Sequence, residues 1–409
     1  MAHSGQTSSW ISRTCLRAPT VAGLAILLIT VMLASPTAQS QTYTLLYSLR
    51  GGKDGSFPYG KLARDAKGNL YGTTSEGGIA EGTVFRIAAA GEGAVLYRFE
   101  AKPDGRMPRA GLVADTAGNG YGTTLEGGTE GYGTIYKLDH RTAKETVLHS
   151  FAAIGDGKFP YAGLTVDAAN TFYGTTSSGG ESFSCKCGTV FRMDAAGNET
   201  ILYNFAGGTD GMAPDGGLIL DAAGSVYGTT SSGGAHGAGT IFRVDTSGKE
   251  TVLYSFTGGT DGSGPDAGLV WDSVGNLYGT APLGGDLNCP SGPQLGCGTV
   301  FKFNPTTGSF SVLHSFTGPP DGDTPVGGVA VDVSGDVYGN SVFGGAFGQG
   351  AVFEVNAAGV ETVVYSFSEN GGEGAGPRGG LILDAAGNLY GTAGGGGEYN
   401  AGVVFEITP

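Results

Sequence analysis

The sequence predicts an all-β fold, a seven-bladed β-propeller of four-stranded antiparallel blades, and three observations support this prediction. A repeat unit occurs seven times in phase along the chain. Each unit holds the same series of short apolar runs separated by turns. The first and last units are incomplete in complementary ways, so that the two ends of the chain can share one sheet. Together these features are typical of a closed ring of blades.

The anchor sequence Tyr-Gly-Thr, or a close variant, sets the period of the repeat. Successive anchors lie 50 to 60 residues apart, which is the range of propeller blades and exceeds that of most solenoid repeats. The anchor tyrosines are Tyr71, Tyr121, Tyr173, Tyr227, Tyr278, Tyr338 and Tyr390. An open β-solenoid is the alternative architecture for such a repeat.

Four apolar runs follow one another in each unit, of the types GLVWD, NLYGT, GTVF and TVLYSF. They are short, rich in β-branched and aromatic residues, and bounded by Gly, Asp, Asn or Pro, which is the pattern of strands. Tight turns such as DSVGN (272–276) and DTSGKE (245–250) join the first run to the second and the third to the fourth. The other two connections are longer. In an up-and-down sheet both emerge on the same side, so we expect one loop-rich face.

The two ends of the repeat region provide the argument for ring closure. A lone fourth run, YTLLYSL (43–49), precedes the first unit, and the chain ends just after a third run, GVVFEI. If the N-terminal run completes the seventh sheet, no unpaired strand edge is left there. An open solenoid leaves both spare strands unexplained, and the closed ring is therefore favoured.

Residues 1–40 have the pattern of a secretory signal peptide. Arg13 and Arg17 precede the apolar run VAGLAILLITVMLA (21–34), and small and polar residues follow it. The run is shorter than the roughly 20 residues of a transmembrane helix, so cleavage near Ser40 is favoured over a permanent anchor. We therefore expect a signal peptide at 1–40 and a single propeller at 41–409. The mature protein would be secreted, periplasmic or at the cell surface, without stable membrane insertion.

The chain is acidic, with 37 Asp and Glu residues against 22 Lys and Arg. Without Arg13 and Arg17 of the predicted signal, 20 basic residues face 37 acidic ones, a net charge near −17. Such a surface repels nucleic acid and anionic lipid and favours solubility. We expect a monomer with no nucleic-acid partner.

The repeat unit itself resembles a known family. The pattern LYSFTGGTDGxxPxAGLVxDxxGNLYGTTxxGG, followed by GCGTVFK at 296–302, resembles the GloVer tandem repeat of bacterial choice-of-anchor proteins. The resemblance extends over about Tyr43 to Pro409. It implies an extracytoplasmic protein with a signal peptide, and it implies no particular reaction. Members of the family carry alternative C-terminal surface anchors, whereas this chain ends in FEITP, so stable C-terminal anchoring is not expected.

Four of the five cysteines follow the predicted signal peptide, an even number that indicates disulfides in an exported protein. Cys289 and Cys297 lie in one enlarged loop and form the predicted pair, which would stabilise the fold by roughly 2–3 kcal/mol on a chain-entropy model. Cys185 and Cys187 lie in the equivalent loop of the third unit. Their short separation is near the geometric limit for a disulfide, so they pair with each other or cross-link elsewhere.

The most prominent acidic motif is Asp-Gly-x-x-Pro, which follows the fourth run. Its acidic residues are Asp54, Asp104, Asp156, Asp210, Asp261 and Asp321, with Glu373 as the variant. Seven carboxylates converging on an axis would suit Ca²⁺, which takes about 6–8 oxygen ligands. Asp-Gly is also the commonest turn dipeptide, and a residue present in every unit is more simply explained by folding. We therefore expect no cofactor, with Ca²⁺ as the alternative.

The sequence contains no recognisable catalytic constellation. His149 and His314 replace a tyrosine of the fourth run and are interpreted as packed substitutions. No histidine pair has metal-ligand spacing, and a zinc site is not expected. There is no Gly-x-Ser-x-Gly elbow and no phosphate-binding loop. No catalytic residue is predicted, and an enzyme is less expected than a binding protein.

Positions that break the pattern inside the repeat frame are the best candidates for function. One such position follows the proline of Asp-Gly-x-x-Pro, just before the innermost strand, and should ring the mouth of the central channel. Its occupants are Tyr59, Arg109, Tyr161, Asp215, Asp266, Val326 and Arg378. Tyrosine rings and charged groups around a concave mouth suit a sugar or an extended polar segment. Drift at an exposed loop position would leave the same variation.

These observations predict a secreted, non-enzymatic binding or structural propeller that presents its loop-rich face to an extracellular glycan or protein. The alternative is a secreted metal-dependent hydrolase or lyase with a carboxylate-lined channel, because propellers host such chemistry through loop variation.

Overall fold

The structure is a computed structural model that describes residues 41–77, 81–100, 102–152, 155–181, 185–290, 295–368 and 372–409. The predicted signal peptide, residues 1–40, lies outside the described residues. All described residues fall in one compact unit, Ser40–Pro409. Within the described part of the chain, no helix has the length and apolar character needed to cross a membrane.

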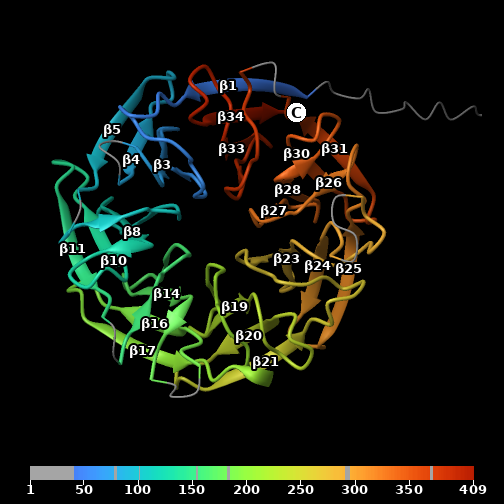
Figure 1. The fold of residues 1–409 in the computed structure, drawn as a ribbon, viewed down its shortest axis with the longest axis horizontal. Helices are drawn as coiled ribbons and strands as arrows, with labels where there is room; N and C mark the ends of the chain where they lie inside the picture. The colour runs from blue at the N-terminus through green and yellow to red at the C-terminus, as the bar shows by residue number, and fades with distance from the viewer. Residues whose placement is uncertain are drawn as a thin grey trace, which may run out of the picture. The chain divides into compact units, whose positions relative to one another are not determined.

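The described residues form seven four-stranded antiparallel sheets arranged as blades around a central axis, which confirms the predicted β-propeller (Figure 1). From the inner to the outer strand, the blades are β2 (Ala63–Arg64), β3 (Leu70–Thr74), β4 (Thr83–Ile87) and β5 (Gly93–Arg98); β7 (Val113–Ala114), β8 (Gly120–Thr124), β10 (Thr134–Leu138) and β11 (Glu145–Ser150); β13 (Thr165–Val166), β14 (Phe172–Thr176), β16 (Thr189–Met193) and β17 (Glu199–Asn204); β18 (Ile219–Leu220), β19 (Val226–Thr230), β20 (Thr240–Val244) and β21 (Glu250–Ser255); β22 (Val270–Trp271), β23 (Leu277–Ala281), β24 (Thr299–Asn304) and β25 (Ser309–Ser315); β27 (Val329–Val331), β28 (Val337–Ser341), β30 (Ala351–Val355) and β31 (Glu361–Ser366); and β32 (Ile382–Leu383), β33 (Leu389–Ala393), β34 (Val403–Thr408) and β1 (Thr42–Ser48). We number these blades 1 to 7.

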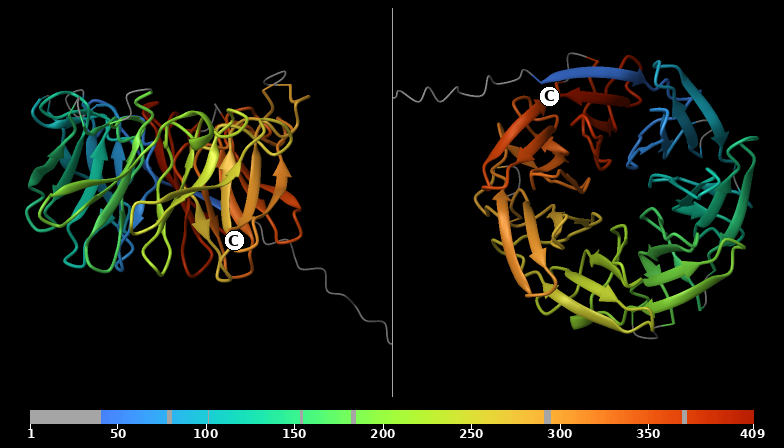
Figure 2. Two further views of the ribbon diagram at one scale, coloured as in Figure 1. Left: turned by 90° about the horizontal axis from the view of Figure 1, so that it is seen from below. Right: turned by 180° about the vertical axis from the view of Figure 1, so that it is seen from behind.

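The two longer connections of each unit lie on the same face, as the repeat pattern predicts. Three two-stranded ladders join them: β6 (Gly105–Arg106) with β9 (Glu126–Gly127), β12 (Gly157–Lys158) with β15 (Ser178–Gly179), and β26 (Gly322–Asp323) with β29 (Phe343–Gly344). A short 3₁₀ turn, η1 (Gly208–Asp210), lies in one of these connections. Seen from the side, the strands run between the two faces of the ring, and the connections gather at those faces (Figure 2).

The N-terminal strand closes the ring. β1 pairs antiparallel with β34, from Thr42 opposite Thr408 to Ser48 opposite Val403. A register shift lies between Leu45 and Tyr47, and the outer strands of the other blades carry the same irregularity. β1 is therefore a full outer strand of blade 7, and the predicted closure is confirmed.

The apolar residue directly after each outer strand is part of the buried core. These residues are Leu49, Phe99, Phe151, Phe205, Phe256, Phe316 and Phe367, and each is fully buried. Phe256 of blade 4, for example, lies 5.2 Å from the ring of Phe301 in blade 5, edge to face. Because a blade cannot bury both of its faces alone, such contacts make the ring one core.

Each residue of the Tyr-Gly-Thr anchor has a separate structural task. The Tyr278 hydroxyl donates to Asp272, the residue that forms the preceding turn, at 3.1 Å. A Cβ atom at Gly279 would lie 2.6 Å from the Phe301 ring, so only glycine lets that ring cross the strand. In four units the threonine hydroxyl bonds to the next blade, as described below. The residues that repeat from unit to unit therefore have structural roles.

Candidate functional site

The seven non-repeating positions surround one cavity on the channel. Its volume is about 770 Å³, and the inner segments of all seven blades line it. Every residue that the sequence analysis placed at the channel mouth is among the lining residues: Tyr59, Arg109, Tyr161, Asp215, Asp266, Val326 and Arg378. The structure therefore brings the whole set of predicted site residues together.

Four of the anchor threonines hold the backbone at these positions in place. Thr73 of blade 1 donates its hydroxyl to the Ala110 carbonyl at 2.8 Å, directly after Arg109. The same bond recurs from Thr123 to Ala162 at 2.9 Å, from Thr175 to Gly216 at 3.3 Å, and from Thr229 to Ala267 at 3.0 Å. In each case the accepting carbonyl belongs to the residue that follows a channel residue. The scaffold thus fixes the backbone of the mouth while its side chains vary.

Aromatic and guanidinium groups alternate along one side of the mouth. The Arg109 guanidinium carbon lies 5.4 Å from the centre of the Tyr161 ring and 6.0 Å from that of Tyr59, and Arg109 Nη1 donates to the Tyr161 hydroxyl at 3.3 Å. The Arg378 guanidinium carbon lies 5.6 Å from the Tyr59 ring. These are cation–π distances. The four side chains form a continuous ladder over blades 3, 2, 1 and 7, which we call the tyrosine–arginine ladder.

Two acidic groups line the opposite part of the ring, in blades 4 and 5. Burial, and then the charge of Asp215, raise the pKa of Asp266 to about 7. Burial also raises the pKa of Asp215, although Ser177 and Ser231 oppose this through hydrogen bonds. Asp266 Oδ1 is shielded from solvent and has no hydrogen-bond partner among the described residues. Burial and the neighbouring negative charge therefore favour the protonated form of Asp266.

Lys61 is a lining residue that the sequence analysis missed. The equivalent position in the other units is glycine (Gly111, Gly163, Gly217, Gly268, Gly328 and Gly380), so the substitution was a visible signal. Its side chain is open to the solvent of the channel, yet the surrounding protein lowers the pKa of the ammonium by desolvation. Together with Arg109 and Arg378, Lys61 makes one side of the cavity cationic, facing the acidic pair.

The Asp-Gly-x-x-Pro acids do not line this cavity. Six of them accept a hydrogen bond from the tyrosine or histidine seven residues earlier, on the outer strand, at 2.5–3.1 Å. We call each such pair a rim clasp. The carboxylates therefore tie outer strands to the following loops and do not converge on the axis, which was the arrangement that the calcium alternative required.

Beside four of the rim clasps lies a glutamate, which is the first residue of the outer strand of the next blade. The glutamates are Glu145, Glu199, Glu250 and Glu361. Burial, and then the charge of the facing aspartate, raise the pKa of each to about 7. In each, Oε1 is shielded from solvent and has no hydrogen-bond partner in the described parts of the chain. These glutamates escaped the sequence analysis because they lie on a different blade from the aspartate.

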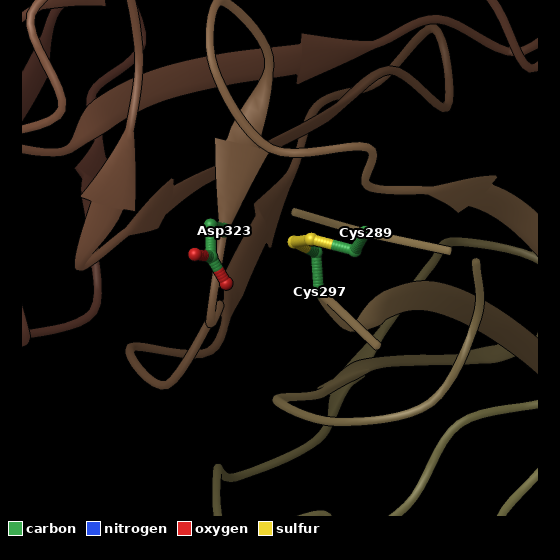
Figure 3. A group of neighbouring side chains, drawn as sticks. All are labelled: Cys289, Cys297 and Asp323. Carbon is green, nitrogen blue, oxygen red and sulfur yellow. A yellow bond between two sulfur atoms is a disulfide. The ribbon is translucent and has the colours of Figure 1, made fainter. Parts of the chain in front are cut away.

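Two disulfides lie in the enlarged loops. Cys289 is bonded to Cys297, as predicted, and Cys185 is bonded to Cys187, which settles the pairing that the spacing left open. Figure 3 shows Asp323, on β26 in the connection that precedes blade 6, beside the first of these disulfides, where Cys289 and Cys297 are both buried. Because thiolates are the metal-binding form of cysteine, this group does not offer a metal site while the disulfide is intact.

Comparison with known proteins identifies the repeat. The family model described as "Gloeobacter/Verrucomicrobia repeat" matches residues 30–187 and 181–405. The chain belongs to this repeat family. The resemblance seen in the repeat unit is thereby confirmed, and it covers most of the propeller. No protein of curated function matches the sequence of this repeat-family member.

Solved structures share its fold at low sequence identity. One is the extracellular domain of a protein described as a hybrid two component system from B. thetaiotaomicron (TM-score 0.56, 12% identity, covering 90% of this chain and 41% of that one). Another is the extracellular domain of a one component system of the same organism (0.54, 10%, 89% and 40%). A third is a GH74 enzyme of Niastella koreensis (0.55, 16%, 85% and 53%). The repeat-family chain thus spans about two-fifths to half of these longer chains, and the likeness shows the propeller fold alone.

Proposed function

We propose that this chain is a secreted, non-enzymatic binding propeller that holds an extracellular glycan at the mouth of its central channel. The observation that carries the proposal is the tyrosine–arginine ladder. Sugar rings present an apolar face that stacks on tyrosine, and their hydroxyls or carboxylates accept hydrogen bonds from guanidinium groups.

The size and stiffness of the cavity support a glycan over a protein domain. A volume of about 770 Å³ is in the range of small-ligand sites, roughly 300–1,000 Å³, and accommodates a few sugar units. Four anchor threonines hold the backbone at the mouth through hydrogen bonds, which limits the conformational entropy lost there on binding. A rigid mouth of this kind suits a short, defined ligand.

Export is part of the proposal. The two disulfides suit an oxidising compartment, since such bonds are rare in the cytosol. The sequence pattern of residues 1–40 gives a route to that compartment. Expression of the full chain in a bacterial host, followed by mass spectrometry of periplasm and medium, tests this part: a mature protein beginning near residue 41 is expected, and a full-length cytosolic protein would refute it.

A glycan array followed by titration of the best ligand tests the binding role. Tyr161→Ala and Arg109→Ala should each weaken binding about tenfold or more, as anchors at the centre of a site do. Val326→Ala is the matched control, because it changes the same frame position without touching the ladder, and it should leave affinity within about twofold. If glycans fail to bind but extended peptides bind and are lost in the same variants, the partner is a protein segment.

A second candidate function rests on the acidic pair. Asp215 and Asp266 line one cavity, and burial raises the pKa of both carboxyl groups, that of Asp266 to about 7. Neighbouring carboxyl groups with shifted pKa values are a common acid–base arrangement. This favours the alternative of a hydrolase or lyase.

One variant, Asp266→Asn, distinguishes a binding protein from an enzyme. For a binding protein, Asp266→Asn keeps affinity within a few-fold, and no product forms from the bound glycan after prolonged incubation. For an enzyme, the wild type releases product and Asp266→Asn abolishes release while the ligand still binds.

A further inference from the structure

Two rim clasps differ from the others in carrying histidine. Where the remaining clasps use tyrosine, His149 on β11 faces Asp156, and His314 on β25 faces Asp321. In both, a glutamate of the next blade completes the group, Glu199 on β17 and Glu361 on β31. Each group therefore combines one imidazole and two carboxylates from two adjacent blades.

The geometry of the two groups is the same. In each, one ligand atom of the histidine, aspartate and glutamate lies within 4.8 Å of the other two. The histidine Nε2 to aspartate Oδ2 distance is 3.0 Å for His149 and 3.1 Å for His314. Ligands bound to one zinc ion at about 2.0–2.2 Å in a tetrahedral site lie about 3.5 Å apart. Side-chain shifts of roughly 1 Å would therefore complete such a site.

The groups are sheltered, and they contain an unpaired acceptor. The side chains of His149 and Asp156 are 21% and 12% exposed, and those of His314 and Asp321 are 18% and 13% exposed. Glu199 Oε1 and Glu361 Oε1 are shielded from solvent without a hydrogen-bond partner among the described residues. A shielded carboxylate oxygen without a partner is costly, and a cation would satisfy it.

We propose that His149, Asp156 and Glu199, and separately His314, Asp321 and Glu361, bind one Zn²⁺ each. The ligand set favours zinc among the common ions, because imidazole suits zinc whereas Ca²⁺ and Mg²⁺ take oxygen ligands. A water molecule would fill the fourth position. To bind through Nε2, the neutral imidazole would carry its hydrogen on Nδ1, so that Nε2 is free to coordinate the ion.

The tyrosine clasps explain why only two sites are expected. Tyr203 donates to Asp210 at 2.8 Å, with Glu250 beside it, so the carboxylates are the same and only the imidazole is missing. Neutral tyrosine offers a donor hydrogen to the aspartate and no comparable ligand to zinc. The two zinc ions would clamp blade 2 to blade 3 and blade 5 to blade 6, and they are independent of the channel.

The test is isothermal titration of ZnCl₂ into untagged, chelator-treated mature protein, together with the visible absorption of added Co²⁺. Wild type should bind two ions per chain, His149→Tyr and His314→Tyr one each, and the double variant none at these sites. Tyrosine restores the hydrogen bond that the neighbouring clasps use, so the variants should fold. His236→Asn, in a loop of blade 4, is the control and should still bind two.

The thermal readout follows the same pattern. Zinc should raise the melting temperature of wild type and leave the double variant unchanged, because only binding to the folded state stabilises it. Absence of zinc binding to wild type at about 100 μM, or two ions retained by the double variant, would overturn the proposal.

Discussion

Asp261 and Asp266 lie five residues apart in one loop, and their surroundings shift their pKa values in opposite directions. Asp261, in a rim clasp, accepts hydrogen bonds from the Tyr254 hydroxyl and the Thr257 N–H, each at 2.9 Å. Burial acts to raise its pKa, but these bonds outweigh burial and hold the pKa below the ordinary value. At Asp266, in the channel, a backbone hydrogen bond and the charge of Arg378 do not outweigh burial and the charge of Asp215, and the pKa rises to about 7.

The opposite pKa shifts distinguish a structural aspartate, Asp261, from an aspartate of the candidate site, Asp266. The Asp-Gly-x-x-Pro acid recurs in every unit and has a structural partner that recurs with it. Asp266 occupies a position that varies from blade to blade, and one of its oxygens has no partner among the described residues. A polar group kept buried without a partner costs stability, and such costs concentrate at functional sites. Variation inside a fixed frame is thus the useful signal in a repeat protein.

The largest effect is expected from a change to the scaffold that touches neither aspartate. Phe256→Ala should lower the free energy of unfolding by about 3–5 kcal/mol, because it opens a cavity at a fully buried contact between blades. Urea denaturation measures this. Phe343→Ala, at a residue that is 50% exposed, is the control and should change stability by less than about 0.5 kcal/mol. Equal effects would mean that the strand-end phenylalanines do not join the blades.

A smaller loss is expected from the rim clasp itself. Asp261→Ala should cost about 2–3 kcal/mol, because the Tyr254 hydroxyl and the Thr257 N–H lose their acceptor in a sheltered place. The loss should shrink as pH falls below about 4, since a carboxylate with a lowered pKa stabilises the fold only while it is ionised. A loss that persists unchanged at pH 3 would contradict this account.

The fold was predictable in detail because every blade repeats the same local information. Turn residues, strand residues and the incomplete end units all indicated one ring, and β1 with β34 confirmed it. The inner strands are shorter than the GLVWD runs suggest, mostly two residues. A Cβ atom at Gly111 would lie 2.0 Å from the Lys61 carbonyl oxygen, so near the axis the inner segments touch backbone to backbone and leave no room for longer ladders.

The candidate site was predictable in position and not in contacts. Its frame position was visible because the residue after the proline ranges over Tyr, Arg, Asp and Val, whereas the residue before it is always Pro and the residue after it is always Gly or Ala. The tyrosine–arginine ladder joins four blades, and the histidine clasps join residues 7 and 50 apart, as in His149, Asp156 and Glu199. Such contacts depend on how adjacent blades are rotated against each other, which the sequence of one blade does not encode.

Substitution of Asp266, in the channel, should stabilise the fold, whereas substitution of Asp261, in a rim clasp, should destabilise it. A group whose pKa is raised in the folded state stabilises it below the unfolded pKa, near 4, and that contribution is lost as pH rises through 7. Asp266→Asn should therefore raise the free energy of unfolding at pH 8 by about 1–2 kcal/mol after allowance for solvent in the channel, and it should have little effect at pH 4. Urea denaturation across pH 4–8 measures it. If Asp266→Asn instead lowers the free energy of unfolding at pH 8, Asp266 has a structural role like that of Asp261.

The smallest effect on stability, and the sharpest on ligand binding, is expected where a tyrosine clasp is converted into a histidine clasp. In zinc-free buffer Tyr203→His should change stability by less than about 0.5 kcal/mol, because His149 already occupies the equivalent position one blade earlier with the same aspartate contact. With zinc, it should add a third ion to the two of wild type, since Asp210 and Glu250 supply the carboxylates. Tyr203→Phe, which removes the hydroxyl without adding a ligand, should add none. If histidine at this position creates no site, an imidazole beside the two carboxylates is not sufficient to bind zinc, and this would argue against zinc at His149 and His314 as well.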